Sequence, residues 1–313
     1  MKLESFCQTT NRLNDEEFLQ QVYQTYLKRD PDEDGKNLYL QSLQEGKLDR
    51  QQLVTSFSQS PEFQNISQLE KIISQCPWLE VVSYHIPKTS GCTFWGILEQ
   101  VYGAENIVHY YGESSITRGN CTSQTKAIHG HFQARKYDKI PFYYQTIIWL
   151  RHPIIRLISL YFYGKTTPSV DANDHIHKYL LDNDLDILEF AKIPEVQNEM
   201  SAYFSGKDIT EFGFVGIQEF FTEDVEEFKK IMNWPDFNIY IGNKNYDDSY
   251  PKSLQTILSD KTLVKQLISL NLKDMELYQR ALELRAKRKG LSNSLEQFKL
   301  QSTETFPLEI NQK

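Results

Sequence analysis

A short loop between an apolar run and a helical pattern carries the residues best suited to bind an anion. The apolar run Val81–Ile86 stops at Pro87, and Lys88–Thr93 follow before the helical pattern continues from Phe94. The backbone N–H groups and the dipole of a helix start attract negative charge. Because the loop also offers a lysine and several hydroxyls, it is a predicted site for a phosphate or a sulfate. The alternative is an ordinary solvated turn.

The order of residues in this loop is not that of a Walker loop. In G-x-x-x-x-G-K-[ST] the lysine stands directly before the hydroxyl that binds magnesium. Here Lys88 comes first, directly after the apolar run, and a single glycine, Gly91, follows it in the loop. The loop therefore does not predict a metal-bridged phosphate chain, and a nucleotide phosphotransferase of the P-loop type is kept as an alternative.

A second anion site is predicted at the end of another strand. Residues Tyr144–Leu150 form an almost continuous apolar run, which is typical of a buried strand. Arg151 follows directly, Pro153 marks the first turn of a helix, and Ser159 lies about two turns into it. A guanidinium and a hydroxyl suit a second phosphate group. Taken alone, Arg151 is equally an arginine that ties a strand end to a neighbour.

Two histidines end a third strand-like run, KAIHGHF. Strand alternation predicts that the rings of His129 and His131 point to the same side. Histidine is the natural base for a poor nucleophile such as a sugar hydroxyl. A structural role and a zinc site are the alternatives, although Cys121, the nearest thiol, lacks a CxxC partner and no third ligand stands at a helpful spacing.

These segments resemble those of the sulfotransferases. HIPKTSGCTFW is similar to their 5′-phosphosulfate loop, and LRHPIIRLISLYFY is similar to their 3′-phosphate segment. The likeness is to the carbohydrate sulfotransferases related to the heparan sulfate 2-O-sulfotransferases, which have bacterial members. It covers about Val81 to Arg285, because AIHGHF, QNEMSAYFSG, FGFVGIQEFF and LYQRALEL also match in the family's order.

The resemblance implies a role for each matching residue. The donor would be 3′-phosphoadenosine 5′-phosphosulfate, with no metal, and Lys88 would contact its sulfuryl group and bridging oxygen. His131 would be the base that takes the proton of the acceptor hydroxyl, and His129 would support it. The remaining donor contacts would be Thr89, Ser90, Gly91, Cys92 and Thr93 around the 5′-phosphate, and Arg151 and Ser159 on the 3′-phosphate.

Three residues differ from the family's pattern. Ser90 stands where the family usually has glycine, Cys92 where it usually has threonine or serine, and His152 where it usually has aspartate. The first two differences loosen the predicted sulfate loop, whereas the third leaves Arg151 intact. A non-catalytic glycan-binding or scaffold protein with a decayed nucleotide site is therefore a further hypothesis.

Composition narrows the class of protein. The chain has 313 residues and a net charge of −8, so nucleic acid is not an expected partner. No window approaches the roughly 20 apolar residues of a membrane helix, and the first residues hold no apolar secretory region. The four cysteines, Cys7, Cys76, Cys92 and Cys121, lack the spacing of a disulfide framework. We therefore expect a bacterial, cytoplasmic enzyme without a transmembrane segment.

Strands that alternate with helices predict an α/β fold with a P-loop-like, mainly parallel sheet flanked by helices. Ligands of such sheets bind beyond the carboxyl ends of the strands, where Lys88, His131 and Arg151 would converge. The predicted domains are a small all-helical domain over 1–75, a sulfotransferase domain over 76–290 and a polar tail over 291–313.

The first domain is similar to a phycobilisome-linker-like bacterial domain of unassigned function. Asp30, Asp32, Asp34 and Gly35 imitate the opening of a calcium loop, but Gln41 stands where that loop needs glutamate. We therefore expect a capped turn between helices at this position.

Later segments give coarser expectations. Residues Asn238–Asn245 predict a strand and a turn, and Leu254–Lys289 predict a long helical stretch interrupted near Asn271. An acidic polymer would be a suitable ligand if basic residues line the cleft, namely Arg118, Lys126, Arg135 and Lys136.

The leading hypothesis is a sulfotransferase that moves a sulfuryl group from the adenosine donor to a hydroxyl of a bacterial saccharide or glycoconjugate, as in polysaccharide biosynthesis.

Overall fold

Five short parallel strands form one sheet in the order β2-β3-β1-β4-β5. The computed structural model describes residues 3–110, 121–134, 144–167, 175–242 and 250–291. Each strand pairs with its neighbours in parallel register, which confirms the predicted α/β sheet. The strands are β1 (Val81–Tyr84), β2 (Ile107–Tyr110), β3 (Ala127–Gly130), β4 (Gln145–Leu150) and β5 (Phe214–Ile217).

Helices surround this sheet and make up the N-terminal region. Among the residues described, none of them is long and apolar enough to cross a membrane. The α-helices are α1 (Leu3–Thr9), α2 (Asp15–Val22), α3 (Glu33–Gln44), α4 (Arg50–Ser58), α5 (Pro61–Ser74), α6 (Gly91–Tyr102), α7 (Pro153–Thr166), α8 (His175–Asp182), α9 (Ile187–Ala191), α10 (Glu199–Ala202), α11 (Phe221–Met232), α12 (Tyr250–Ser259), α13 (Lys261–Ser269) and α14 (Leu272–Arg288). Short turns of other helix types are η1 (Tyr23–Leu27), η2 (Ala104–Asn106), η4 (Ile209–Glu211) and η5 (Gln218–Phe220).

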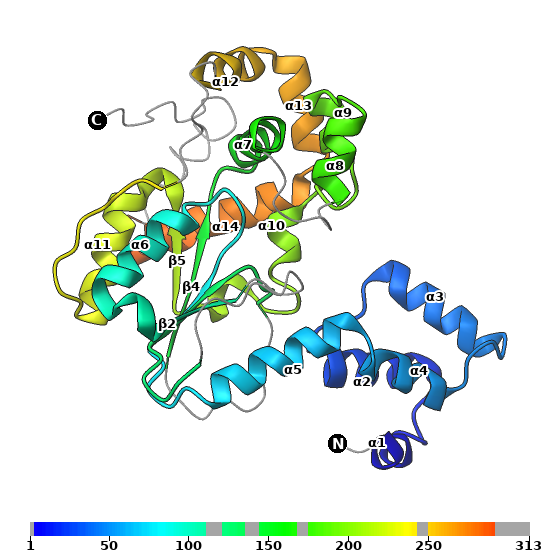
Figure 1. Cartoon of the computed structure of the whole chain (residues 1–313). Helices are drawn as coiled ribbons and strands as arrows, with labels where there is room; N and C mark the ends of the chain where they lie inside the picture. Colours follow the sequence, from blue (N-terminus) through cyan, green and yellow to red (C-terminus); the bar gives the residue numbers. More distant parts are fainter. Residues whose placement is uncertain (1–2, 111–120, 135–143, 168–174, 243–249, 292–313) are drawn as a thin grey trace.

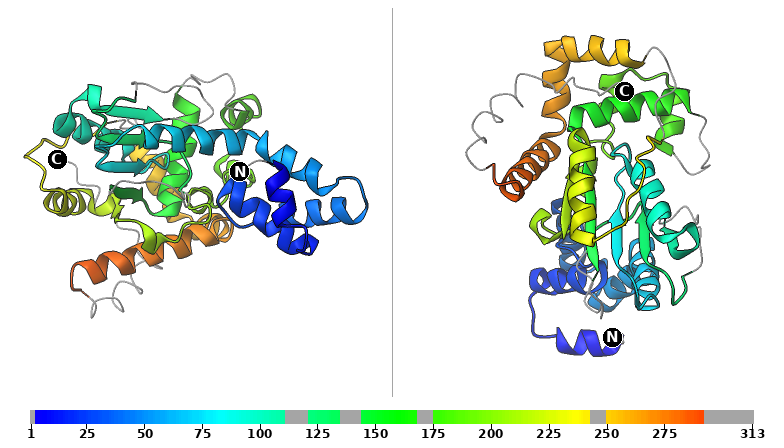
Figure 2. Two further views of the ribbon diagram at one scale, coloured as in Figure 1. Left: turned by 90° about the horizontal axis from the view of Figure 1, so that it is seen from below. Right: turned by 90° about the vertical axis from the view of Figure 1, so that its left-hand side faces the viewer.

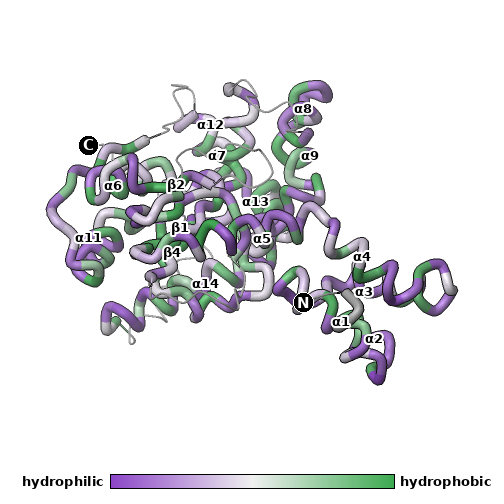
Figure 3. Tube along the Cα trace, turned by 60° about the horizontal axis from the view of Figure 1, so that its bottom comes forward, coloured by the Kyte–Doolittle hydropathy of each residue, from purple (hydrophilic) through white to green (hydrophobic). Residues whose placement is uncertain are grey.

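Different helices cover the two faces of the sheet (Figures 1 and 2). In β1 to β4, odd-numbered residues such as Val81 and Ile147 pack into a core with α6 and α11. Even-numbered residues such as Val82 and Ile148 pack into a second core with α5 and α14. This division follows from the two-residue period of a strand. Hydrophobic residues accordingly concentrate along the strands, and hydrophilic ones along the outer helices (Figure 3).

The helices α1 to α4 gather around a core of their own, beside the sheet (Figure 1). Phe18 and Phe57 are buried in it. The side chain of Asp49 caps α4, and Asp32 caps α3 by accepting a hydrogen bond from the Gly35 N–H at 2.8 Å. The capped turn that was expected at residues 30–35, where the chain passes from η1 into α3, is therefore confirmed.

Helix α5 belongs to both halves of the molecule. Ser60 caps its start and Pro61 occupies its first turn, a position that proline tolerates well. Ile66 is buried in the N-terminal core, whereas Leu69 and Ile73, about one and two turns further on, are buried in the core under the sheet. One continuous helix therefore fixes the helical region against the α/β region.

Two expectations for the later segments need correction. Residues Asn238–Gly242 form no strand, because their backbone pairs with side chains of α6: the Asn238 N–H donates to Gln100 at 2.9 Å, and the Gly242 N–H donates to Thr93 at 3.1 Å. Residues 243–245 lie outside the described residues. The long helical stretch breaks at Asn271 as expected, and it breaks again at Asp260, whose side chain caps α13.

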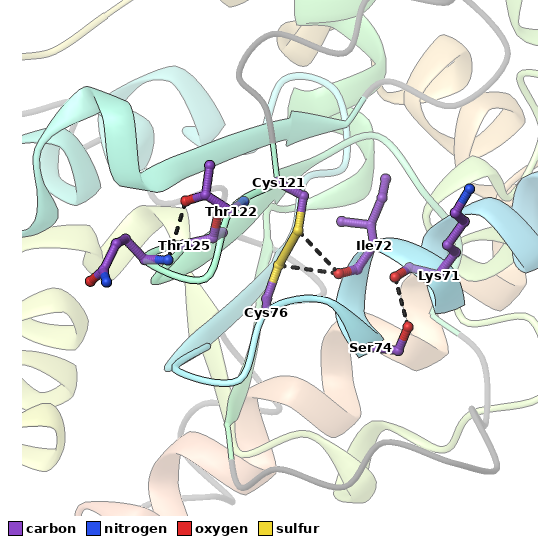
Figure 4. Close-up of a disulfide and its surroundings, with 8 residues drawn as sticks. Lys71, Ile72, Ser74, Cys76, Cys121, Thr122 and Thr125 are labelled. Carbon is purple, nitrogen blue, oxygen red and sulfur yellow. Dashed lines mark hydrogen bonds between the residues drawn. A yellow bond between two sulfur atoms is a disulfide. The ribbon is translucent and has the colours of Figure 1, made fainter.

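The cysteines also depart from expectation. Cys76 and Cys121 form a disulfide, although they are 45 residues apart in sequence (Figure 4). Cys76 follows the end of α5 and Cys121 precedes β3, so the fold brings together two residues whose spacing carries no signal. Closing a loop of this length restricts the unfolded chain by about 4 kcal/mol in the chain-entropy model. The disulfide therefore links the end of α5 to the segment that precedes β3.

Candidate active site

The predicted anion loop connects β1 to α6. Two of its residues, Lys88 and Ser90, have positive φ angles of 67° and 69°. Thr89 is buried and its hydroxyl donates to the Ile86 carbonyl at 2.8 Å. A left-handed conformation costs a residue other than glycine roughly 1–3 kcal/mol. Ser90 stands where the family that this loop resembles usually has glycine. It therefore adopts the left-handed conformation of the turn with backbone strain.

The Lys88 side chain lies under α7. Its Nζ atom is 4.0 Å from the centroid of the Tyr163 ring, so its ammonium rests on an aromatic face. Burial, and then the charge of Arg151, lowers the pKa of Lys88 to about 8. Ser159 lies one turn before Tyr163 on the same helix face and is buried. The face of α7 that carries Ser159 is thus turned toward the anion loop.

Arg151 follows β4 and joins the two predicted anion sites. Its Nη1 atom donates to the Lys88 carbonyl at 3.2 Å. The turn behind it is held by Glu219, which accepts the His152 N–H at 2.9 Å and the Tyr278 hydroxyl at 3.2 Å. Burial raises the pKa of Glu219. Since Glu219 holds this turn from η5, directly after β5, it positions Arg151 relative to Lys88.

His152 and Arg156 on α7 have structural surroundings. His152 packs edge-on against Tyr278, and burial lowers its pKa to about 4. Arg156, only 1% exposed, pairs with Glu199 of α10 at 2.8 Å. Neither side chain therefore competes with Arg151 as an anion ligand.

Four histidines gather at the carboxyl ends of three adjacent strands. The register places Ser83, His129 and His109 side by side in one row, and His129 Nδ1 lies 2.9 Å from Ser83 Oγ. The His85 ring stacks on His129 with centroids 5.1 Å apart, and His85 Nδ1 lies 3.1 Å from Nε2 of His131. His85 therefore connects the two histidines of the HGH segment.

Burial governs the protonation of this cluster. It lowers the pKa of His131 to about 4 and the pKa values of His85 and His129 well below their usual range. Charges on neighbouring histidines lower the last two further. All three imidazoles are consequently neutral near pH 7, so each has a lone pair and one N–H group.

Two glycines make room for the cluster. A Cβ atom at Gly91 would lie 2.0 Å from the His85 ring, so the start of α6 can approach that ring only as glycine. A Cβ atom at Gly130, between His129 and His131, would lie 1.6 Å from the Tyr110 carbonyl oxygen. The HGH segment therefore needs its central glycine to stay in register with β2.

The structure brings the predicted residues together at one edge of the sheet. Lys88 contacts Arg151 directly, and His85, three residues before Lys88, contacts His131. Cys92 and Thr93 open α6, where the Gly242 N–H donates to the Thr93 hydroxyl and a Cβ atom at Gly242 would lie 3.2 Å from Cys92 Cβ. Within the described part of the chain, no group of three or more His, Cys, Asp or Glu residues is placed to hold a metal ion.

Sequence reasoning missed four residues of this site: His85, His109, Tyr163 and Glu219. His85 precedes the anion loop, and the alternation that predicted the orientation of His129 and His131 applies to it as well. Tyr163 stands four residues after Ser159, the spacing of one helix face. Glu219 has no such signal, because it reaches the Arg151 turn from η5, a distant segment that follows β5.

The predicted anion loop after β1 and Arg151 after β4 lie beyond the carboxyl ends of a parallel sheet, where open α/β sheets bind their ligands. The model of the Sulfotransferase family matches residues 74–279, about two thirds of the chain, and the chain belongs to that family. A domain of unknown function, DUF4214, matches residues 1–66. No curated protein matches the sequence.

Proposed function

We propose that the protein is a carbohydrate sulfotransferase, related to the heparan sulfate 2-O-sulfotransferases, that uses 3′-phosphoadenosine 5′-phosphosulfate. The acceptor is a hydroxyl of a saccharide or glycoconjugate. One observation carries the proposal: the anion loop, Arg151 and the histidine cluster meet at the same edge of the sheet. We also propose that the chain is divided into a helical domain (1–75), a sulfotransferase domain (76–290) and a tail (291–313).

The residues at this edge fit a doubly phosphorylated donor. The ammonium of Lys88 rests on a ring rather than on a carboxylate, so it is available to an anion. We assign Lys88 and Thr89–Thr93 to the 5′-phosphosulfate, and Arg151 and Ser159 to the 3′-phosphate. When bound, the donor supplies an activated sulfuryl group, and the protein supplies positioning and charge.

In this proposal Lys88 neutralises the charge that builds on the leaving 5′-phosphate, and His131 takes the proton of the acceptor hydroxyl. In the tautomer whose Nε2–H donates to His85, the lone pair of His131 that receives the proton is on Nδ1. His85 thereby orients His131, and His129 supports His85 by stacking on its ring. A nearby donor anion raises the pKa of His131 from about 4 toward the neutral range, where a general base works best.

Isothermal titration with 3′,5′-adenosine bisphosphate tests the donor site. The wild type should bind, and Arg151→Ala should weaken binding by about tenfold or more, because a charge-assisted contact to phosphate contributes about 1.5–3 kcal/mol. The matched control is Arg280→Ala, since Arg280 pairs with Asp208 on the surface and should not affect affinity. A wild type that does not bind, or an Arg151→Ala variant that binds as well as the wild type, would exclude this function.

We also propose that the protein is bacterial and cytoplasmic. Cytoplasmic thiols are kept reduced, so we expect Cys76 and Cys121 to be reduced in intact cells and to pair on purification in air. Alkylation before lysis, followed by mass spectrometry, measures this state, with Cys7 and Cys92, which lie outside the disulfide, as internal controls. A disulfide already present in cells would place the protein in an oxidising compartment instead.

A further inference from the structure

A cavity of about 800 Å³ lies between the N-terminal helical domain and the sulfotransferase domain. The segment between η1 and α3, together with α5, forms one wall. The ends of β2 and β3 and the region of α10 form the other. His131 is part of the lining, so the cavity reaches the proposed base. Its volume is in the range of sites for small ligands, about 300–1,000 Å³.

The two walls are held at a fixed separation. Gly206 has a φ of +81°, and a Cβ atom there would lie 2.9 Å from Arg29 Cα, so the two domains touch backbone to backbone. On the other side of the cavity, the Tyr110 hydroxyl donates to the Asn65 carbonyl at 3.2 Å. Helix α5, which carries Asn65, also contributes to the cores of both domains. The cavity is therefore defined by contacts between the two domains.

The helical wall is acidic. Among the described residues, it carries the carboxylates Asp30, Asp32 and Glu62 and one guanidinium, Arg29. Arg29 is engaged, since it donates to Glu62 at 2.8 Å and to Asp32 at 2.9 Å. Carboxylates accept hydrogen bonds from hydroxyl or amino groups, and their charge repels polyanions.

The described residues of the opposite wall are polar or apolar, and none of them is charged apart from the charge that His131 can acquire. Gln133, Ser201 and Ser205 offer amide and hydroxyl groups to the cavity. Of the four basic residues that would suit an acidic polymer, one belongs to the described part of the chain. Lys126 pairs with Glu80 before β1 and β3, at the opposite edge of the sheet, and Arg118, Arg135 and Lys136 lie outside the described residues.

We propose that this cleft binds the acceptor, that the helical domain thereby supplies one wall of the acceptor site, and that the acceptor is a saccharide without negative charge. The proposal rests on the proposed function, because it gives the cleft its role through the base His131. The helical domain in this view is a substrate-binding element rather than a separate module.

The test uses the full chain and a donor labelled with sulfur-35. A total glycan extract of the producing cells is divided by anion exchange into an anionic and a non-anionic pool, and each is supplied below saturation. The variants are Asp30→Lys, which reverses a charge on the helical wall, and Ala202→Trp, which fills the cleft. Glu45→Lys is the matched control, because Glu45 lies at the end of α3 outside the cleft lining.

We expect label in the non-anionic pool. Both cleft variants should reduce it by about tenfold or more, while Glu45→Lys leaves it unchanged. Titration with 3′,5′-adenosine bisphosphate should give the wild-type affinity for all three variants, which shows that they are folded. Unchanged transfer by both cleft variants, label mainly in the anionic pool, or no label although the nucleotide binds would overturn the cleft proposal. Failure to bind the nucleotide would instead defeat the proposed function itself.

Discussion

Replacement of Lys88 by methionine should lower kcat for sulfuryl transfer by about 10³-fold. Methionine fills a similar space but cannot neutralise the charge that develops on the leaving phosphate. Removal of a single uncharged hydrogen-bond donor from such a site already lowers the rate by about 10²–10³. The ammonium lies on the Tyr163 ring and is subject to the charge of Arg151, so the effect should fall on the rate more than on folding. Initial rates with the labelled donor measure it.

The pKa of Lys88 also predicts how kcat/KM decreases at alkaline pH, which is the alkaline limb of the pH profile. With a pKa of about 8, Lys88 is charged below pH 8 and loses its proton above it. Therefore kcat/KM, which reports the unliganded enzyme, should fall about tenfold per pH unit above 8. The limb should disappear in Lys88→Arg, because a guanidinium stays protonated. Lys207 is the control: burial lowers its pKa too, but it lies over Phe212, and Lys207→Met should keep the limb. A limb that persists in Lys88→Arg would assign it to another group.

Much of the site could be predicted because its parts stand at strand ends. The apolar runs before Lys88, His131 and Arg151 are long enough to be recognised, and parallel strands that share a sheet present their carboxyl ends at one edge. The strand β2 (Ile107–Tyr110) is as long as β1 and β3, but it was missed because no recognisable motif follows it in the sequence. His109, which β2 contributes to the row of histidines, was therefore missed as well.

Contacts that depend on the relative placement of distant segments left no local pattern. The alternating residues near Ile239 suit a strand, yet the segment lies on α6, because its polar backbone groups find partners in Gln100 and Thr93. The disulfide depends on where α5 ends relative to β3. The cleft depends in part on Gly206, which lets one domain touch Arg29 of the other. Local periodicity carries no information on any of these three.

Replacement of His131 by glutamine should lower kcat by about 10²–10⁴, the usual contribution of a general base. The amide of glutamine can still donate a hydrogen bond toward His85, so the cluster keeps its packing, but it cannot take a proton. The affinity for 3′,5′-adenosine bisphosphate should stay close to that of the wild type, because the phosphates are assigned to Lys88, Arg151 and the start of α6. Titration and initial rates on the same preparation separate the two quantities.

A second measurement distinguishes a base from a residue that only positions the substrate. Added imidazole should restore part of the activity of His131→Ala, since it can enter the space left by the ring and accept the proton. His129→Gln is the matched control. His129 is buried against Ser83, so imidazole should have no effect there, and its loss should lower stability more than it lowers kcat. If imidazole rescued neither variant and His129→Gln lost more activity than His131→Gln, the base would be His129 and the acceptor would have to approach from the α6 side of the sheet.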